Sequence, residues 1–225
     1  MTHKLTLRSI SPVTRDTNHL VFDRPEGFAF TPGQATDLSL DKEGWRDEKR
    51  PFTFVNLPES ETLEFVIKSY PDHDGVTERI GRLQPGDTVL IEEPWGAIED
   101  KGPGTFIAGG AGVTPFIAVL RERMAEHGTL DGCTLIFSNK TEEDIILRRT
   151  FERMEGLRTV FTVTDDPGAQ VEKERIDKAF LQKHVSDPGS GHFYVCGPEP
   201  MIDDVVAALK EMGVDEERII TEDLD

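Results

Sequence analysis

Cysteine is scarce in this chain of 225 residues, which contains only Cys133 and Cys196. Two cysteines cannot build a framework of several disulfides, and they cannot hold an iron–sulfur cluster, which takes four protein ligands. The histidines show none of the spacings typical of a metal site, so we expect no bound metal. The scarcity of cysteine favours a reduced, cytoplasmic setting.

Long apolar runs and excess positive charge are also missing. No stretch of 18 apolar residues occurs, and the first ten residues are polar rather than typical of a secretion signal. The chain has 25 Lys and Arg residues against 43 Asp and Glu residues, a net charge of −18. This charge argues against nucleic acid and anionic membranes as partners. The sequence leaves monomer and dimer open.

The first hundred residues contain short segments rich in β-branched and aromatic residues, separated by turns with Pro, Gly and Asp. One short helix is expected near residues 75–83. Strands of this length and spacing predict a six-stranded antiparallel Greek-key barrel. The expected strands are 4–10, 18–24, 35–40, 51–57, 62–70 and 84–93.

After the breaker cluster KGPG, the pattern changes to strands that alternate with helices. This alternation predicts a doubly wound parallel α/β sheet. We therefore expect two domains, a β-barrel over residues 1–100 and an α/β nucleotide-binding domain over 103–225. In the second domain the expected strands are 105–109, 134–139, 158–164, 192–197 and 218–223, and the expected helices are 113–127, 142–154, 175–185 and 200–212.

A glycine-rich stretch, FIAGGAGVTPF, marks the end of the first strand of the predicted parallel sheet. Ligands of doubly wound sheets bind beyond the carboxyl ends of the strands. Glycines there let the backbone approach a pyrophosphate, and a proline suits the first turn of the following helix. The alternative is a glycine-rich turn with no ligand. The candidate cofactor-binding residues are Gly110, Gly112, Val113, Thr114 and Pro115.

Three further segments offer groups that can bind a planar or anionic ligand. In KRPFTFVN, a guanidinium can clamp a phosphate, an aromatic ring can pack on a planar ring, and a hydroxyl can hydrogen-bond a ring nitrogen. HDGVTERI opens a helix, and CGPEPM follows a strand of the parallel sheet. Ordinary barrel packing, a capped turn and a small buried cysteine are the alternatives. The candidate residues are Arg50, Pro51, Phe52, Thr53, Gly75, Val76, Thr77, Cys196, Gly197, Pro198 and Met201.

In this order, the four segments resemble the ferredoxin–NADP reductase superfamily of flavin oxidoreductases over nearly the whole chain. In that family Arg-x-Tyr-Ser/Thr and Gly-x-x-Ser/Thr hold the flavin, and the chain has Arg50–Thr53 and, with its hydroxyl one position early, Gly75–Thr77. The family's Gly-x-Gly-x-Thr-Pro and Cys-Gly-Pro match 110–115 and 196–198. Phe52 stands where tyrosine is usual. Residues 222–225 lack the terminal aromatic that many members lay over the flavin, which implies a less shielded flavin face.

The resemblance implies an NAD(P)H-dependent flavin oxidoreductase. Hydride would pass from nicotinamide C4 to flavin N5, and electrons would then reach a separate acceptor: a ferredoxin, a flavodoxin, an oxygenase component or a small molecule. Thr53 would hydrogen-bond near N5, and Cys196 would set the approach of C4. FAD is favoured over FMN, with Tyr70 as a candidate partner of the adenine. The alternatives are an obligate electron-transfer subunit of a larger redox complex and a non-catalytic binding module.

The electron donor depends on how the second domain meets the ribose next to the adenine. Segments 137–149 and 196–202 resemble NADH–cytochrome b5 reductases, and Asp165 is a candidate acceptor for the hydroxyls of an NADH ribose. Lys140, Arg148 and Arg149 favour the 2′-phosphate of NADPH instead. We expect NADH, with NADPH as the alternative.

Docking of an acidic electron acceptor would need local positive charge on this acidic protein. Four cations near the expected flavin edge are candidates for such a basic patch. They are Lys49, Arg50, Arg79 and Arg82.

Overall fold

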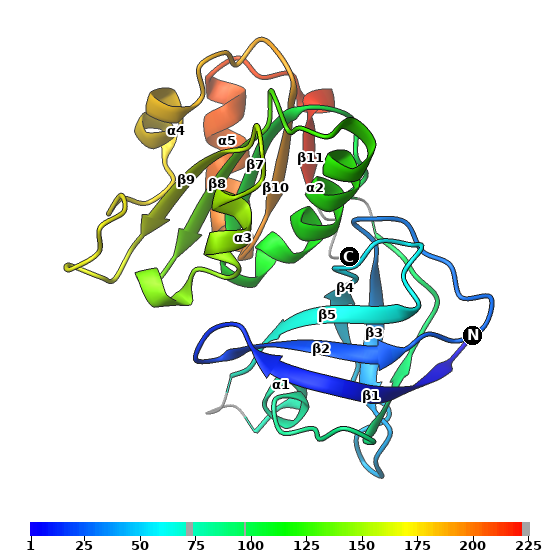
Figure 1. Ribbon diagram of the computed structural model, residues 1–225. Helices are drawn as coiled ribbons and strands as arrows, with labels where there is room; N and C mark the ends of the chain where they lie inside the picture. Colours follow the sequence, from blue (N-terminus) through cyan, green and yellow to red (C-terminus); the bar gives the residue numbers. More distant parts are fainter. Residues whose placement is uncertain (71–73, 97, 222–225) are drawn as a thin grey trace.

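The computed structural model describes residues 1–70, 74–96 and 98–221, and it has a barrel and a layered α/β unit lying side by side (Figure 1). Residues 222–225, where the terminal aromatic is missing, lie outside the described residues. Within the described part of the chain, no helix has the length and apolar character needed to cross a membrane.

The barrel is an antiparallel sheet in the order β4-β3-β6-β1-β2-β5. It is nearly closed, because the chain just after β4 reaches β5: the Val55 N–H donates to the Glu64 carbonyl at 2.9 Å. The Asn56 amide adds a second link by donating to the Thr62 carbonyl at 2.8 Å. The strands are β1 His3–Pro12, β2 Thr17–Asp23, β3 Ala35–Leu40, β4 Arg50–Thr53, β5 Thr62–Lys68 and β6 Thr88–Ile91.

Alternating strand residues fill the barrel with large apolar side chains, as the period of two requires. Phe54 lies at the centre: its ring stacks on Phe30 at 4.4 Å and tilts against Phe65 at 5.1 Å. The short helix α1, Val76–Ile80, adds Val76 and Ile80 to this core. The barrel therefore has its own hydrophobic core.

The second unit is a parallel sheet in the order β11-β10-β7-β8-β9. The strand order reverses beside β7, since β8 follows on one side and β10 on the other, and this point is where doubly wound sheets bind ligands. The predicted fold is confirmed. The strands are β7 Gly104–Gly109, β8 Thr134–Asn139, β9 Arg158–Val163, β10 His192–Cys196 and β11 Ile219–Thr221, and the longer helices are α2 Thr114–His127, α4 Lys178–His184 and α5 Glu199–Glu211.

Helices cover both faces of this sheet (Figure 1). One face carries rings that pack under α2 and α3, the helix Arg148–Glu152; on this face Phe106 stacks on Tyr194 at 4.3 Å. The opposite face carries the alternate residues, such as Ile107 and Val195, which pack against α4 and α5. Because both faces are buried, the middle of each central strand is a continuous apolar run, as in Phe106–Ala108 and Leu135–Phe137.

The expected helix 142–154 forms only in part, as α3 over Arg148–Glu152, and its first half is not α-helical. Glu142–Asp144 instead forms a single 3-10 turn, in which Asp144 Oδ2 accepts bonds from the Thr141 N–H at 3.1 Å and from Thr141 Oγ1 at 2.8 Å. Ile145 is extended, and a turn follows in which Leu147 has a left-handed backbone with φ of 52°. Both Ile145 and Ile146 are buried. This non-helical stretch lets the neighbouring isoleucines both pack inward, so burial overrides the helical pattern there.

A linker between β6 and β7 joins the two units, and the α/β unit holds it closely. The Arg123 guanidinium, on α2, donates to both carboxylate oxygens of Asp100 at 2.7 and 3.0 Å. The Tyr194 hydroxyl accepts from the Lys101 N–H at 2.9 Å and donates to the Gly102 carbonyl at 2.8 Å. Burial raises the pKa of Tyr194 to about 12. The linker is thus fixed to the sheet by side chains from α2 and β10.

Candidate functional site

A cleft of about 1310 Å³ separates the barrel from the carboxyl edge of the parallel sheet. One wall comes from β4, β5 and the barrel turns, and the other comes from the residues that follow β7, β8, β9 and β10. This cleft lies at the point where the strand order reverses, which is where doubly wound sheets bind ligands.

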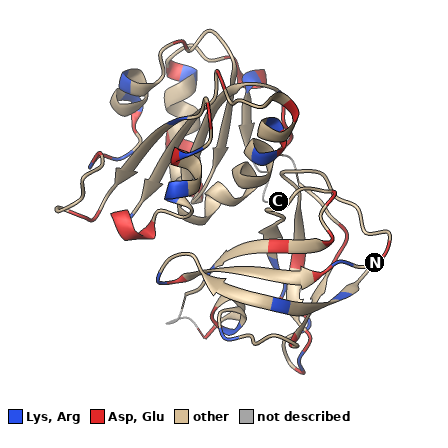
Figure 2. Cartoon of the chain, in the orientation of Figure 1, with Lys and Arg blue, Asp and Glu red and all other residues tan. Residues whose placement is uncertain are grey.

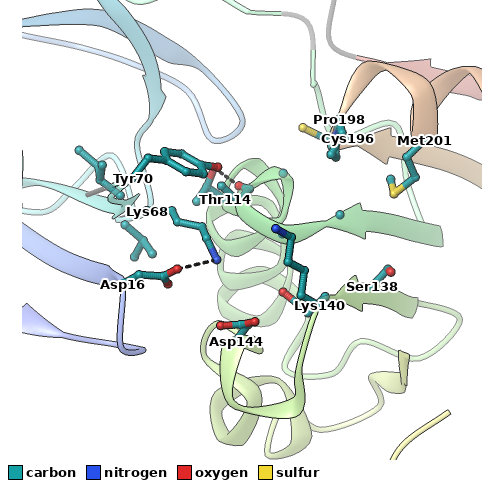
Figure 3. A pocket seen from close by; sticks show the side chains of 18 of the residues that line it. Asp16, Lys68, Tyr70, Thr114, Ser138, Lys140, Asp144, Cys196, Pro198 and Met201 are labelled. Carbon is teal, nitrogen blue, oxygen red and sulfur yellow. Dashed lines mark hydrogen bonds and ion pairs between the residues drawn. The ribbon is translucent and has the colours of Figure 1, made fainter. Parts of the chain in front are cut away.

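The barrel wall contains five of the predicted residues. Thr53 is 7% exposed, and Phe52 packs against the barrel core beside it. Tyr70 is 46% exposed, and its ring points across the cleft toward Thr114 in Figure 3. Pro51 and Thr77 complete the set that lines the cleft.

Three predicted residues of the barrel lie outside the cleft lining. The Arg50 guanidinium turns back along its own strand end, where it donates to the Lys49 carbonyl at 2.6 Å and lies 3.7 Å from the Glu48 carboxylate. Gly75 precedes α1, and Val76 is buried in the barrel core. Of the helix start at 75–77, Thr77 alone lines the cleft.

The glycine turn after β7 combines an open position with a packed one. Gly110 has a left-handed φ of 54°, and a Cβ built on it would have no atom within 4 Å. A Cβ on Gly112 would lie 2.5 Å from the carbonyl carbon and oxygen of Cys196. The turn can therefore present bare backbone to a ligand while it packs directly on the end of β10. Thr114 Oγ1 donates to the Ala111 carbonyl at 3.0 Å and fixes the start of α2.

The segment after β10 forms the neighbouring part of the same wall. Cys196 is buried at the strand end and pairs in register with Ala108 of β7. Gly197, Pro198 and Met201 also line the cleft, and Figure 3 shows Cys196, Pro198 and Met201 grouped at its far side. Val113 and Pro115, by contrast, are buried in the core beneath the turn.

The cleft also contains charged residues that the sequence did not assign to the flavin side. The Asp16 carboxylate lies 3.1 Å from the Lys68 ammonium (Figure 3). Burial raises the pKa of Asp16, but Lys68 and the hydroxyls of Thr14 and Thr17 lower it by more, so the pKa lies below its usual range. Asp16 lies in the β1–β2 turn and Lys68 in β5. A pattern along the chain could not predict that the folded barrel places both residues at this cleft.

Residues after β8 and β9 were also missed, although the rule on strand ends could have found them. Ser138 and Asn139 end β8, Thr164 follows β9, and all line the cleft. Lys140 points into the cleft in Figure 3, and Arg175 lines it as well. Neither cation has a carboxylate within 4.0 Å among the described residues, so both are available to an anionic ligand.

The residues proposed to select the donor lie in different places. Asp165 is exposed and outside the cleft lining, and its N–H donates to the Lys140 carbonyl at 2.8 Å. Arg148 and Arg149 line a separate groove. Lys140 is thus the one residue of this group that lines the cleft.

The expected basic patch is neutralised in the structure. Acidic residues occur along both domains (Figure 2), and each cation of the patch has a carboxylate partner. Lys49 pairs with Glu92 at 2.8 Å, Arg50 with Glu48 at 3.7 Å, Arg79 with Asp74 at 2.8 Å, and Arg82 with Glu78.

A barrel joined to a doubly wound sheet, with a large cleft at the carboxyl edge of that sheet, is typical of a two-domain nucleotide-binding protein. Two family models match these domains: the oxidoreductase FAD-binding domain over residues 4–99 and the oxidoreductase NAD-binding domain over residues 106–207. The chain belongs to the ferredoxin–NADP reductase superfamily.

Relatives cover most of this chain but extend beyond it. NADH-cytochrome b5 reductase 2 of Mycosarcoma maydis is 28% identical over an alignment of 221 positions that covers 89% of this chain and 63% of that protein. The propane 2-monooxygenase reductase component of Mycolicibacterium goodii is 28% identical over 94% of this chain and 64% of its own length. A solved structure of the CS-b5R domains of human Ncb5or, in its NAD+ form, has a TM-score of 0.88 at 25% identity, covering 98% of this chain and 69% of that one. The chain thus spans under two thirds of the first two relatives.

Proposed function

We propose that the protein is an NAD(P)H-dependent flavin oxidoreductase that passes electrons to a separate acceptor. The observation that carries this proposal is the cleft of about 1310 Å³, whose two walls belong to an FAD-binding domain and an NAD-binding domain. A ligand on each wall would meet the other within that space. Relatives named as reductases support the same conclusion.

The residues of the barrel wall fit a flavin. Phe52 and Tyr70 offer ring faces, and the nearly buried Thr53 hydroxyl offers one hydrogen-bonding group. When bound, FAD supplies the hydride acceptor and NAD(P)H the hydride. The role of this wall is to orient the flavin toward the nicotinamide. Holding two reacting groups in the right geometry removes most of the entropic cost of bringing them together.

The opposite wall fits a dinucleotide. The bare backbone at Gly110 admits a pyrophosphate, and the cations Lys140 and Arg175 supply positive charge beyond it. Cys196 closes the end of the cleft as a contact surface. We propose that it sets the approach of the nicotinamide.

NADH is the proposed donor, and the relatives named NADH-cytochrome b5 reductases support it. For the acceptor we propose a separate redox protein, such as an oxygenase component, a ferredoxin or a flavodoxin. An acceptor of this kind would have to dock without a free basic patch at Lys49, Arg50, Arg79 and Arg82, since each is paired with a carboxylate.

An anaerobic titration tests the proposed function. The purified protein, reconstituted with FAD, is mixed with NADH or with NADPH while the visible flavin absorbance is recorded. We expect bleaching by a stoichiometric amount of NADH and weaker bleaching by NADPH. A protein that binds no flavin, or that stays oxidised with both nucleotides, would overturn the proposal. Ferricyanide reduction without any added protein then separates a free reductase from an obligate subunit.

A further inference from the structure

A second hollow lies on the seam between the two domains, apart from the nucleotide cleft. This groove has a volume of about 460 Å³. Pro12, Val13 and Val55 line it from the barrel, and Ile145 and Leu147 line it from the α/β domain. Val66 borders both the groove and the cleft. The proposed function uses none of the other groove residues.

Positive charge collects in this groove, although the chain has a net charge of −18. Arg121, Arg148 and Arg149 all line it. Arg148 is satisfied, because it pairs with Glu142 and, at 2.8 Å, with Glu152. Over the described ranges, Arg121 and Arg149 have no carboxylate within 4.0 Å. Most other cations of this acidic protein are paired, so two unpaired arginines in one groove set it apart.

Arg121 is the more constrained of the two arginines. Its Nη1 donates to the Val55 carbonyl at 2.7 Å, across the domain seam. Burial lowers the pKa of Arg121, and the charge of Glu64 raises it in part. Glu64 itself accepts a hydrogen bond from His19 at 2.9 Å. A guanidinium stays charged throughout the physiological range, and Glu64 compensates the burial of this one only in part, so a bound anion would stabilise it further.

The apolar wall of the groove contains a strained residue. Leu147 has a φ of 52°, which a branched side chain rarely adopts. Such conformations persist where the surrounding structure enforces them, and they are frequent at ligand sites. Leu147 lies next to Arg148 and Arg149 in the chain, so its backbone conformation presents the cationic and the apolar parts of the groove together.

We propose that this groove binds a small organic carboxylate with a compact apolar body. The carboxylate would pair with Arg149 and Arg121, and the apolar body would contact Pro12, Val13 and Leu147. The volume lies within the range of pockets for small molecules, about 300–1,000 Å³. Because its walls come from both domains, the bound molecule would bridge them. This site goes beyond the proposed function and does not depend on it.

Calorimetric titration with 1-naphthoate tests the site, with saturating NAD+ present to fill the nucleotide cleft. We expect one naphthoate per chain, and binding at least tenfold weaker for the uncharged 1-naphthamide, which has the same ring system. Absence of naphthoate binding, equal binding of the amide, or loss of binding when NAD+ is added would each overturn the proposal.

Variants locate the bound molecule. Arg149→Gln, at an exposed position, is expected to weaken naphthoate binding about tenfold, as loss of one charged hydrogen bond implies. Arg121→Gln should also weaken naphthoate binding. If Arg121→Gln folds poorly, Arg149→Gln still tests the site. Lys140→Gln, in the nucleotide cleft, is the matched control and should leave naphthoate affinity unchanged. Unchanged affinity in Arg149→Gln, or a loss confined to Lys140→Gln, would contradict the proposal.

Discussion

At the residue scale, the two glycines of the turn after β7 are constrained by different forces. Gly112 needs the absence of a side chain, since a Cβ would lie 2.5 Å from the backbone of Cys196. Gly110 needs only its left-handed φ of 54°, because the space in front of it is open. We expect Gly112→Ala to lower the stability of the α/β domain more than Gly110→Ala. For Gly110→Ala we expect the free energy of unfolding to fall by roughly 1–2 kcal/mol, the cost of a left-handed backbone at a residue with a side chain.

Thermal unfolding and NAD+ titration of the two variants measure this difference. Gly112→Ala should also lose most of its NAD+ affinity, because the clash moves the turn away from Cys196. Equal effects of the two substitutions would mean that packing against β10 does not set the shape of the turn.

The choice between donors gives a second prediction at this scale. Lys140 follows β8, on the side of the cleft beyond the glycine turn, where the adenosine half of a dinucleotide would lie. Lys140→Gln should weaken NADPH binding about five- to tenfold and NADH binding less, since one charged contact to the 2′-phosphate is lost. Dissociation constants for both nucleotides test this. Arg153→Gln, an exposed cation outside the cleft, is the control, and equal weakening of both nucleotides would contradict the prediction.

Spacing along the chain could predict only part of the cleft. Glycines at strand ends and the Cys-Gly-Pro segment are local signals, and Gly110, Gly112, Cys196 and Gly197 do line the cleft. Asp16 and Lys68 give no such signal, because their position depends on how the barrel packs against the sheet. Arg50 was predicted to bind the cofactor from its sequence motif, but in the structure its guanidinium lies beside Glu48 and outside the cleft lining.

At the scale of elements, Tyr194 couples β10 to the linker and makes stability depend on pH. Its pKa is about 12 in the folded protein, against about 10 when unfolded. Below pH 10 the phenol keeps its proton in both states, and its contribution is complete. As the pH rises from 10 to 12, the unfolded chain releases the proton first, so stability falls by up to about 2.7 kcal/mol.

Urea unfolding at pH 9 and pH 11 tests this expectation. Tyr194→Phe should reduce the alkaline loss, and it should also be less stable at pH 7 because Lys101 and Gly102 lose their partner. Tyr70→Phe, at the chain's other tyrosine, is the control and should keep the alkaline loss. The same loss in wild type and Tyr194→Phe would show that another group causes it.

Elements with a clear period were predictable, and the segment without one was not. Alternation in the barrel and apolar strands in the sheet predict every strand of both sheets, with ends that differ by a few residues. The helix predicted over 142–154 is interrupted at 145–147, where Ile145 and Ile146 both pack inward. Before the interruption, Thr141 and Asp144 cap the start of a turn of only three residues.

At the scale of the whole molecule, one ion pair joins the two walls at the cleft. Arg15, on the β1–β2 turn, lies 3.2 Å from Asp144 of the α/β domain. Arg15 is 64% exposed, so Arg15→Gln should cost less than about 1 kcal/mol of stability. Asp144→Asn should cost more, since Asp144 also caps the turn through Thr141.

We expect Arg15→Gln to slow flavin reduction by NADH severalfold, because the pair limits movement of one wall against the other. Stopped-flow absorbance with increasing salt measures the rate. Salt should slow the wild type toward the variant, since it screens an exposed pair, and Arg15→Lys should retain much of the wild-type rate. Identical rates in wild type and Arg15→Gln at low salt would contradict this role.

Strand pairing also dictates an order of assembly during synthesis. β1 pairs with β6, and Ala35 of β3 pairs with Trp95, so the barrel cannot close until residues near 95 have left the ribosome, but no strand of the parallel sheet belongs to it. β7 pairs with both β8 and β10, so the central strand of the sheet keeps an open edge until residues near 196 have been made. Domains generally fold as units in the order in which they are made. The barrel is therefore expected to be complete while the α/β half is still a nascent chain, and the late arrival of β10 makes that half the more vulnerable to misfolding and aggregation.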